Sequence, residues 1–264
     1  MTSRIEVAPD GAQSLHRAIG LLRVLSMRVA TGWRLSDLAQ EASLGHSTVH
    51  RMLDCLLRER LVVRVPGTRR YTLGPLAYEL GVSAAPHFAI DRLAAPGLAR
   101  LGGETRDIVF LNVRSGAESV CVARCEGRKA LKAYTVEVGT RRPLSLSAGG
   151  AAMLIRLPRT AQSSIEAHNL RAIVRRGEAR QIAVQRMLQR SRRLGYGFNR
   201  EDIIPGIAAI GVAICSPSGD PVASLSLAAA GADLALPRRQ RVLARLREEA
   251  ALLEAALPQL RYPP

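Results

Sequence analysis

The side chains best suited to chemistry in this sequence are hydrogen-bond donors gathered between residues 36 and 70. Ser47 and Thr48 bring hydroxyl groups to the expected start of a helix, and Arg51 follows one turn later. Hydroxyl and backbone N–H groups at a helix N-terminus bind phosphate, and an arginine can donate two hydrogen bonds to a guanine edge. The segment therefore predicts recognition of a nucleic acid, with these candidate residues: Ser36, Ser47, Thr48, His50, Arg51, Arg64, Arg69 and Arg70.

Patterns typical of catalysis or metal binding are missing from the sequence. There is no G-x-S-x-G, P-loop, G-x-G-x-x-G or H-E-x-x-H motif. His87 and His168, outside the N-terminal segment, have no partner pattern typical of a catalytic base. The four cysteines form no C-x-x-C pair, and Cys121 and Cys125 are expected on one face of a strand as core residues. We therefore predict no catalytic residues, no metal and no cofactor.

Hydrophobic periodicity predicts three short helices that would position the donors. Apolar residues recur at helical spacing from Leu15 to Val29, with Ser14 as a candidate N-cap. Ser36 is expected to cap a second helix, and a third begins near Ser47 after a tight turn at residues 43–46. This order is that of a helix-turn-helix. Taken alone, the third helix fits an ordinary charged surface helix equally well.

A β-hairpin is expected directly after the third helix. Residues 61–65 and 69–73 alternate as strands, and Pro66-Gly67 has the chemistry of a type II turn. A hairpin in this place is the wing of a winged helix-turn-helix, and its arginines would face the DNA backbone. We therefore predict a winged helix-turn-helix domain over residues 11–74.

Residues 86–264 predict a second domain with mixed helices and strands. Strands are expected at 108–113, 119–125, 207–215 and 222–228, with a further strand pair at 130–138. Helices are expected at 88–101, 181–194 and 238–257, and a loop at 139–150 opens a short apolar helix. The prediction is an α+β domain in which helices flank an antiparallel sheet.

The N-terminal domain resembles the DNA-binding domain of IclR-family regulators. The resemblance is carried by SLHRAIGLLRVL at 14–25, LSDLAQEASLGHSTVHRMLDCLLRERLVVR at 35–64 and RRYTLGPLAYELG at 69–81. It implies a linker helix over residues 75–85, where Pro75 suits a first helical turn. Arg60-Leu61 departs from the family, which usually has a glycine before the first wing strand, and this departure predicts a changed wing angle.

The C-terminal domain resembles the effector-binding domains of the same family, which have a GAF-like α/β fold. The matching segments are VGTRRPL at 138–144, LGYGFNRED at 194–202 and GIAAIGVAICSPSGDPVASLSL at 206–227. The resemblance implies an effector site at one end of the sheet, with these residues: Ala148, Gly149, Asn199, Ala209, Ser226 and Ala228.

The chemistry implied for this site is that of a carboxylate. Backbone amides of Ala148 and Gly149 at a helix start suit a carboxylate, so the implied effector is an organic acid. Some members have an acidic residue, a cysteine and a second serine where this chain has Asn199, Ala209 and Ala228. These departures predict a larger or more apolar ligand, such as an aromatic acid.

These features together predict a DNA-binding transcriptional regulator controlled by a small organic acid. We expect a homodimer or a dimer of dimers on a palindromic operator. The net charge of +16 is compatible with DNA but is spread over the whole chain. The polar N-terminus and the lack of a long apolar run predict a cytoplasmic protein without membrane contact. The alternatives are a sensor whose winged helix contacts a protein, and a small-molecule enzyme.

Overall fold

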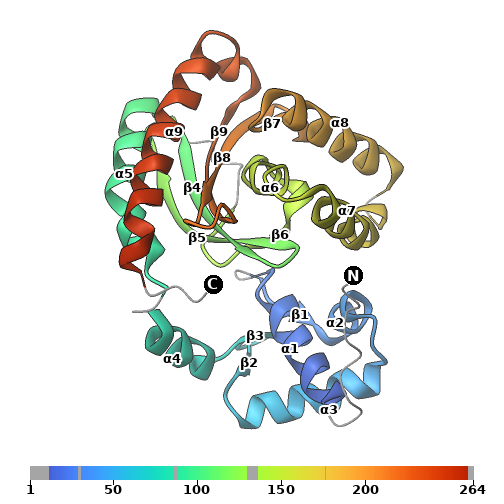
Figure 1. The fold of residues 1–264 in the computed structure, drawn as a ribbon. Coiled ribbons are helices and arrows are strands. Elements are labelled where there is room, and N and C mark those ends of the chain that lie inside the picture. Colours follow the sequence, from blue (N-terminus) through green and yellow to red (C-terminus); the bar gives the residue numbers. More distant parts are fainter. Residues whose placement is uncertain (1–11, 29–30, 86–87, 130–135, 176, 261–264) are drawn as a thin grey trace. The chain divides into compact units, whose positions relative to one another are not determined.

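The computed structural model describes residues 12–28, 31–85, 88–129, 136–175 and 177–260, and the chain forms two compact units (Figure 1). One unit comprises Met1–Pro86 and the other His87–Pro264. Each unit has its own hydrophobic core.

The N-terminal unit has the order of elements expected for a winged helix-turn-helix. Its elements are α1 (Gln13–Leu25), β1 (Trp33–Arg34), α2 (Leu35–Ala42), α3 (His46–Arg58), β2 (Val62–Arg64), β3 (Arg70–Leu73) and α4 (Pro75–Ala84). The strands form an antiparallel sheet in the order β1-β3-β2. Leu21, Leu38 and Val49, one from each of the first three helices, are completely buried in a common core. Strand β1 was not predicted, because two residues carry no periodic pattern.

Two predicted helix caps are wrong. The N-cap of α1 is Ala12 and not Ser14, and the N-cap of α2 is Arg34 and not Ser36. Arg34 is extended because it pairs with Arg70 in the sheet, so the N-cap lies two residues earlier than predicted. The Ser36 hydroxyl donates instead to Asp37 Oδ1 at 3.2 Å. Val29, expected in the first helix, lies outside the described residues.

The tip of the wing is the type II turn that the sequence predicted. Gly67 has a φ of +69°, a conformation that favours glycine, and it follows Pro66. The N–H of Thr68 donates to the carbonyl of Val65 at 3.1 Å, which closes the turn. The hairpin is therefore short and its tip is exposed.

The C-terminal unit is built on an antiparallel sheet with the strand order β6-β5-β4-β9-β8-β7 among the described residues. Its strands are β4 (Ile108–Ser115), β5 (Glu118–Glu126), β6 (Arg141–Pro143), β7 (Gly197–Ile204), β8 (Ile207–Cys215) and β9 (Pro221–Ala230). Its helices are α5 (Ile90–Thr105), α6 (Ala148–Leu154), α7 (Arg159–Val174), α8 (Glu178–Leu194) and α9 (Arg238–Ala256), with short 3₁₀ turns at Leu144–Leu146, Gly231–Leu234 and Leu257–Gln259. The α+β fold predicted from the sequence is confirmed.

Helices cover both faces of this sheet. Figure 1 shows α5 and α9 on one face and α6, α7 and α8 on the other. The larger core lies under α5 and α9, where Leu101 and Leu246 meet Ile210 and Leu227 of the sheet. Arg100 of α5 donates two hydrogen bonds of 2.8 Å to the carboxylate of Glu249, which is buried on α9. The two helices are thus joined by a charged pair above an apolar layer.

The prediction that Cys121 and Cys125 share one face of a strand is wrong. The register of β4 and β5 shifts between Leu111, which pairs with Ala123, and Asn112, which pairs with Cys121. Val122 is the extra residue of a β-bulge, so residues on its two sides face opposite ways. Cys121 joins the cluster that contains Phe110 and Ala148, whereas Cys125 packs against the core under α5 and α9.

Among the α-helices and strands of this unit, α7, β6 and β7 were not predicted. The strand pair expected at 130–138 falls in part on residues 130–135, which lie outside the described ranges. Residues 136–140 form a loop and a turn and not a strand. A membrane-spanning helix is not found in the part of the chain that the structure describes.

Candidate functional sites

Helix α3 presents the predicted hydrogen-bond donors at its N-terminal end. Gly45 is its N-cap and supplies no side-chain cap, so the first N–H groups of the helix are available to another partner. Ser47 and Arg51 are exposed, and the Arg51 guanidinium has no hydrogen-bond or ion-pair partner among the described residues. Val49, Leu53 and Leu56 bury the opposite face. The exposed face therefore offers the Arg51 guanidinium and the N–H groups of the helix start, both of which suit binding to a phosphate backbone.

His50 is less free than the sequence suggested. Its Nδ1 lies 3.0 Å from Oδ2 of Asp54, one turn along the exposed face of α3. Both side chains are about half exposed. The pair leaves Nε2 as the nitrogen that can reach outward from the helix.

A basic groove of about 600 Å³ lies beside the start of α2 and the wing. It is lined by Arg34, Leu35, Ser36, His46, Thr68, Arg69 and Arg70. The structure thus brings three of the predicted residues together: Ser36, Arg69 and Arg70. Arg34 and His46 were missed, although Arg34 directly precedes a predicted helix and His46 stands in the predicted turn. Hydroxyl groups and guanidinium groups that converge in one groove are suited to an anionic backbone.

The arginines of the wing differ in whether their guanidinium groups contact another part of the unit. Arg70 donates from Nη1 to the carbonyl of Gly32 at 3.1 Å, and the Arg64 guanidinium lies 5.6 Å from the centre of the Tyr71 ring. Arg69, at the wing tip, is exposed and has no partner among the described side chains. Arg69 is therefore the wing arginine that can move to meet a phosphate at the lowest cost.

In the C-terminal unit, the predicted effector residues of the strands lie on the sheet face that α6 covers, and Ala148 and Gly149 begin α6 itself. Asn199, Ala209 and Ala228 are successive register partners on β7, β8 and β9. Ser226 stands two residues before Ala228, and so on the same face. A side chain added at Gly149 would lie 3.2 Å from Ser226 Oγ, which places the start of α6 directly over that serine.

Two paired glycines form the seat of α6. Gly197 and Gly211 are register partners on β7 and β8. A Cβ atom at Gly197 would come within 1.8 Å of the Ala148 carbonyl oxygen, and one at Gly211 within 2.7 Å of the Gly149 nitrogen. The helix start therefore rests on bare backbone, where only glycine leaves room.

A small hollow opens beside this seat. It is lined by Phe110, Asn112, Ser119, Val136, Thr140, Arg142, Ser147 and Ser226, and its volume is about 20 Å³. That volume holds about one water molecule. Of the predicted residues, Ser226 lines it, while Ala148, Ala209 and Ala228 belong to the apolar cluster around Phe110 and Val136.

Sequence reasoning missed most of the polar lining of this hollow. Asn112 donates from Nδ2 to Ser226 Oγ at 3.4 Å, and the buried hydroxyl of the neighbouring Ser224 has no hydrogen-bond partner among the described atoms. Arg142 contributes the positive charge. Alternation along β4 and β9 was the available signal, because Phe110 and Asn112 face the same way as Ser224 and Ser226.

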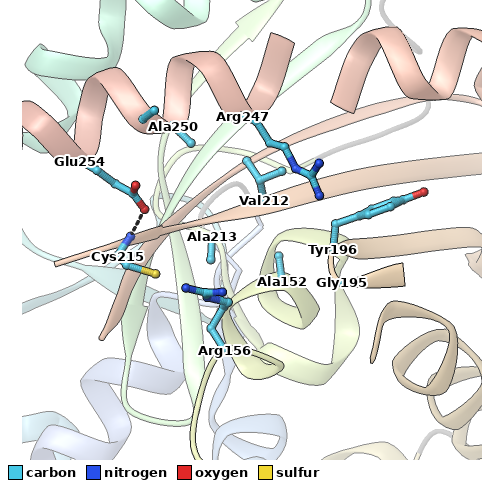
Figure 2. A pocket seen from close by; sticks show the side chains of 11 residues that line it. Ala152, Arg156, Gly195, Tyr196, Val212, Ala213, Cys215, Arg247, Ala250 and Glu254 are labelled. Atoms are coloured by element: carbon cyan, nitrogen blue, oxygen red, sulfur yellow. Dashed lines mark hydrogen bonds between the residues drawn. The ribbon is translucent and has the colours of Figure 1, made fainter. Parts of the chain in front are cut away.

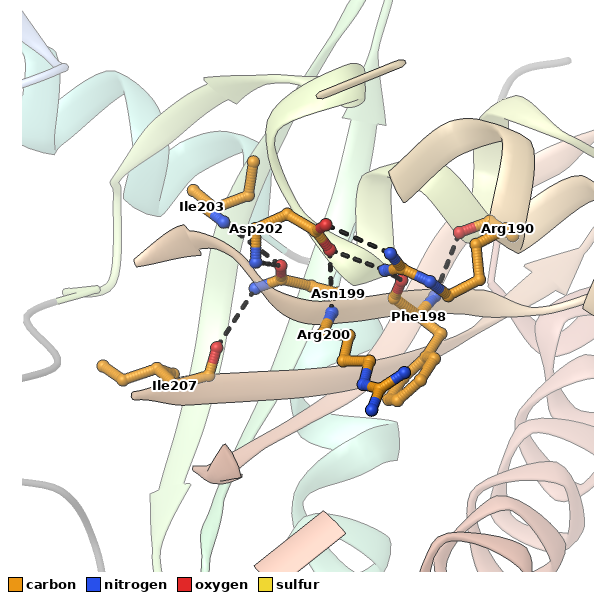
Figure 3. Close-up of polar contacts among 8 residues, drawn as sticks. Arg190, Phe198, Asn199, Arg200, Asp202, Ile203 and Ile207 are labelled. Carbon is orange, nitrogen blue, oxygen red and sulfur yellow. Dashed lines mark hydrogen bonds and ion pairs between the residues drawn. The ribbon is translucent and has the colours of Figure 1, made fainter. Parts of the chain in front are cut away.

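The side chain of Asn199 stabilises the local fold. Its Oδ1 accepts the N–H groups of Asp202 and Ile203 at 2.9 and 3.2 Å, and its Nδ2 donates to the Ile207 carbonyl (Figure 3). Asp202 in turn receives two hydrogen bonds from Arg190 of α8. The amide therefore holds the irregular end of β7, and its hydrogen-bonding capacity is largely occupied.

Cys121 lies in the apolar cluster beside the hollow. Cys121 is buried in the same cluster as Phe110 and Val136, and burial raises the pKa of its thiol to about 11. A group of three or more residues suited to a metal ion is not present in the described ranges.

Comparison with known families accounts for both units. The model of the IclR helix-turn-helix domain matches residues 14–66, and that of the bacterial transcriptional regulator IclR C-terminal domain matches residues 82–254. The chain is 26% identical over 216 residues to the HTH-type transcriptional regulator XynR of Escherichia coli, covering 81% of this chain and 85% of the relative.

Solved structures share the fold. The IclR-family transcriptional regulator from Brucella abortus superposes with a TM-score of 0.74 at 19% identity, covering 97% of both chains. An IclR homologue from Microbacterium hydrocarbonoxydans, solved with 4-hydroxybenzoate, gives a TM-score of 0.67 at 22% identity, covering 93% of this chain and 99% of that one.

Proposed function

Because this chain belongs to the IclR family of bacterial DNA-binding transcriptional regulators, which are not enzymes, we propose specific roles for its two units. The N-terminal unit binds an operator through the exposed face of α3, the basic groove and the wing. The C-terminal unit binds a small organic acid that controls this activity. Both roles belong to the cytoplasm, where bacterial DNA lies.

The observation that carries the DNA-binding role is the unpaired Arg51 beside the uncapped start of α3. In a winged helix-turn-helix this end of the helix enters the major groove, where an arginine reads a guanine edge. Ser47 and Thr48 then lie where a helix start binds the adjoining phosphate. The groove at Arg69 and Arg70 supports the next stretch of backbone.

The test is fluorescence anisotropy on the DNA upstream of the protein's own gene and on a scrambled duplex, each at two salt concentrations. We expect tight, salt-weakened binding to the native duplex, and a loss of about 1–3 kcal/mol in Arg51→Ala. Arg23→Ala is the matched control, because Arg23 is an exposed arginine on α1 of the same unit. Equal and weak binding to both duplexes would instead favour a winged helix that contacts another partner.

We propose that the effector enters at the small hollow under the start of α6. Arg142 and the hydroxyls of Ser226 and Thr140 suit a carboxylate, and Phe110 and Val136 offer an apolar wall. Ala148, Gly149, Ala209 and Ala228 complete the apolar side, with Asn199 at its edge. At about 20 Å³ the hollow must widen to admit an organic acid, so binding moves an element of the unit.

The apolar lining favours an aromatic acid over a two- or three-carbon acid. Isothermal titration of the full chain should show tighter binding of 4-hydroxybenzoate than of pyruvate or glyoxylate. The Ser226→Leu variant, which fills the hollow, should lose that preference. Tight glyoxylate or pyruvate binding without any aromatic-acid binding contradicts the proposal.

We further propose that the chain assembles as a homodimer or a dimer of dimers. Helix α4 has no buried residue among its ten, although Tyr78, Leu80 and Val82 are all apolar and more than half exposed. Leu15 and Ile19 are likewise exposed on α1. A second copy of the chain on these faces would bury them and pair two recognition helices on a palindrome. Sedimentation of the full chain tests this, and a monomer at micromolar concentration contradicts it.

A further inference from the structure

The C-terminal unit has a second, larger hollow that shares no lining residue with the one under the start of α6. Its volume is about 230 Å³, and it lies between the end of α6, the far end of β8 and α9 (Figure 2). Figure 2 shows Arg156 and Arg247 on different sides of it, with Tyr196 at one end and Glu254 at the other.

The floor of this hollow is an unpaired stretch of strand edge. The pairing of β7 with β8 begins at Gly197–Gly211, so β8 from Val212 onward has a strand neighbour only on its β9 side in the described sheet. The N–H of Cys215 points to the free side and donates to Glu254 Oε1 at 2.7 Å. Ala213, two residues earlier, directs its N–H and carbonyl the same way. The floor therefore offers backbone hydrogen bonds to an occupant.

The charges around the hollow favour an anion. Arg156 and Arg247 are exposed, and neither guanidinium has a partner among the described residues. Glu254 is the one carboxylate in the lining, and it already accepts the Cys215 N–H. The two arginines and the one glutamate give the lining a formal charge of +1, which one anionic group neutralises. An arginine binds a carboxylate through two parallel hydrogen bonds.

The remaining surface suits a small apolar body. Ala152, Val212, Ala213 and Ala250 line the hollow with short side chains. Tyr196 is buried, and its hydroxyl has no partner in the described part of the chain. Sites for drug-sized ligands have volumes of about 300–1,000 Å³, so this hollow fits a smaller molecule.

We propose that this hollow is a second ligand site, which binds a small organic monoanion with an apolar body, such as a single-ring carboxylate. The anionic group lies between Arg156 and Arg247, and the ring of the ligand lies over the alanines and Val212. The site is separate from the effector pocket proposed above, and the two proposals can be tested independently.

The experiment uses the full chain and 4-bromobenzoate as the probe, with 4-bromobenzamide as the uncharged molecule of the same shape. Isothermal titration should show saturable binding of the acid and not of the amide. Arg156→Ala and Arg247→Ala should each weaken binding about tenfold, as expected for the loss of one charged hydrogen-bonding partner. Arg241→Ala removes an exposed arginine of α9 that does not line the hollow, and it should leave the affinity unchanged.

A crystal grown with 4-bromobenzoate locates the site in the unaltered protein. Anomalous scattering should place bromine between α9 and the end of α6. Bromine found only under the start of α6 overturns the second site. Binding that is abolished by Ser226→Leu but unchanged in the two arginine variants also overturns it. Either result still supports the effector pocket. Absence of saturable binding to the Ser226→Leu variant, shown to be folded by circular dichroism, also overturns it.

Discussion

Arg60 donates a hydrogen bond from Nη2 to Glu79 Oε1 at 3.0 Å, which joins the corner between α3 and β2 to helix α4. Arg60 has a φ of +57°, in the left-handed region that glycine usually occupies. Its carbonyl accepts the N–H of Leu76, and a Cβ at Gly74 would come within 2.3 Å of the same oxygen. Both the carbonyl and the side chain of Arg60 therefore stabilise the corner where the family usually has glycine. Strand β2 still pairs with β3 in regular register.

Substitutions at Arg60 should separate the backbone cost from the ion pair. A left-handed conformation costs a non-glycine residue about 1–2 kcal/mol, whereas an exposed ion pair contributes about 0–1 kcal/mol. Arg60→Gly should therefore be at least as stable as the wild type, and Arg60→Ala should be less stable than Arg60→Gly by about 1 kcal/mol. Trp33, the single tryptophan, is buried in the core of this unit, so its fluorescence during urea unfolding reports the change.

Glu79→Gln is the control for this pair, because it removes the charge and keeps the shape. It should change the unfolding free energy by less than about 1 kcal/mol. A loss of more than that in Glu79→Gln, or an Arg60→Gly variant less stable than Arg60→Ala, contradicts the assignment of strain to the backbone of Arg60.

The wing should contribute affinity without sequence preference. Arg69 is exposed at the wing tip beside the basic groove, so Arg69→Ala should weaken binding to the native and scrambled duplexes alike. Loss of one phosphate contact should reduce the slope of log K against log salt by about 1. Anisotropy titrations over a salt series measure this, with Arg23→Ala as the reference; a change confined to the native duplex would assign Arg69 to base reading instead.

Asn199 and Ser226 should differ in what their loss affects. Asn199→Ala leaves the partly buried N–H groups of Asp202 and Ile203 without their acceptor, which should cost about 1–3 kcal/mol of stability. Ser226→Ala removes one long hydrogen bond with Asn112, so stability should change little while affinity for an aromatic acid falls. Urea unfolding followed by far-ultraviolet circular dichroism, paired with titration calorimetry, separates the two. The opposite pattern would make Asn199 the ligand-binding residue.

Thiol reactivity should distinguish the buried from the exposed cysteines. The pKa of Cys121 is raised to about 11 by burial, so at pH 8 only about one thiol in a thousand is ionised. Cys55 is exposed on α3 and should react first with iodoacetamide. Peptide mapping by mass spectrometry checks this, and unfolded protein, in which all four thiols react, is the control. Labelling of Cys121 at the rate of Cys55 would contradict its burial.

The glycine seat of α6 should not tolerate a methyl group. Gly211→Ala would place Cβ within 2.7 Å of the α6 backbone, and overpacking of this kind costs about 1–3 kcal/mol. Gly103→Ala is the control, because Gly103 lies in α5 with no atom near its added Cβ, so the helix should gain stability. Thermal unfolding by circular dichroism compares them; equal stability of the two variants would show that α6 can shift freely.

The sequence predicted the elements whose pattern is strong and local. The apolar stripe through Val49 and Leu53 defined α3, and Pro66-Gly67 defined the wing turn. Helix α7 was missed because two of its inward-facing residues are polar: Gln162 donates to the Leu157 carbonyl and Asn169 to the Ala117 carbonyl. Polar residues that are buried because they bond to carbonyls outside the helix leave no periodic apolar signal.

In the candidate sites, too, features with a local sequence pattern could be predicted and features that depend on non-local contacts could not. Alternation along the strands could have indicated Asn112 beside Ser226, but the β-bulge at Val122 could not be predicted from spacing and reversed the expected side of Cys121. The basic groove joins Arg34 to Arg70 through strand pairing, which is a non-local contact. Resemblance to the family indicated the face of the sheet, while the lining residues depend on the register of this chain.

The contact between α6 and the paired glycines Gly197 and Gly211 limits how the unit can respond to an occupant. Where side chains meet, an added group can be accommodated by changes of rotamer. Here backbone rests on backbone, which has no rotamers to change. At this contact, an occupant beneath the start of α6 cannot be accommodated by side-chain rotation, so the backbone of the helix or of the strands has to move.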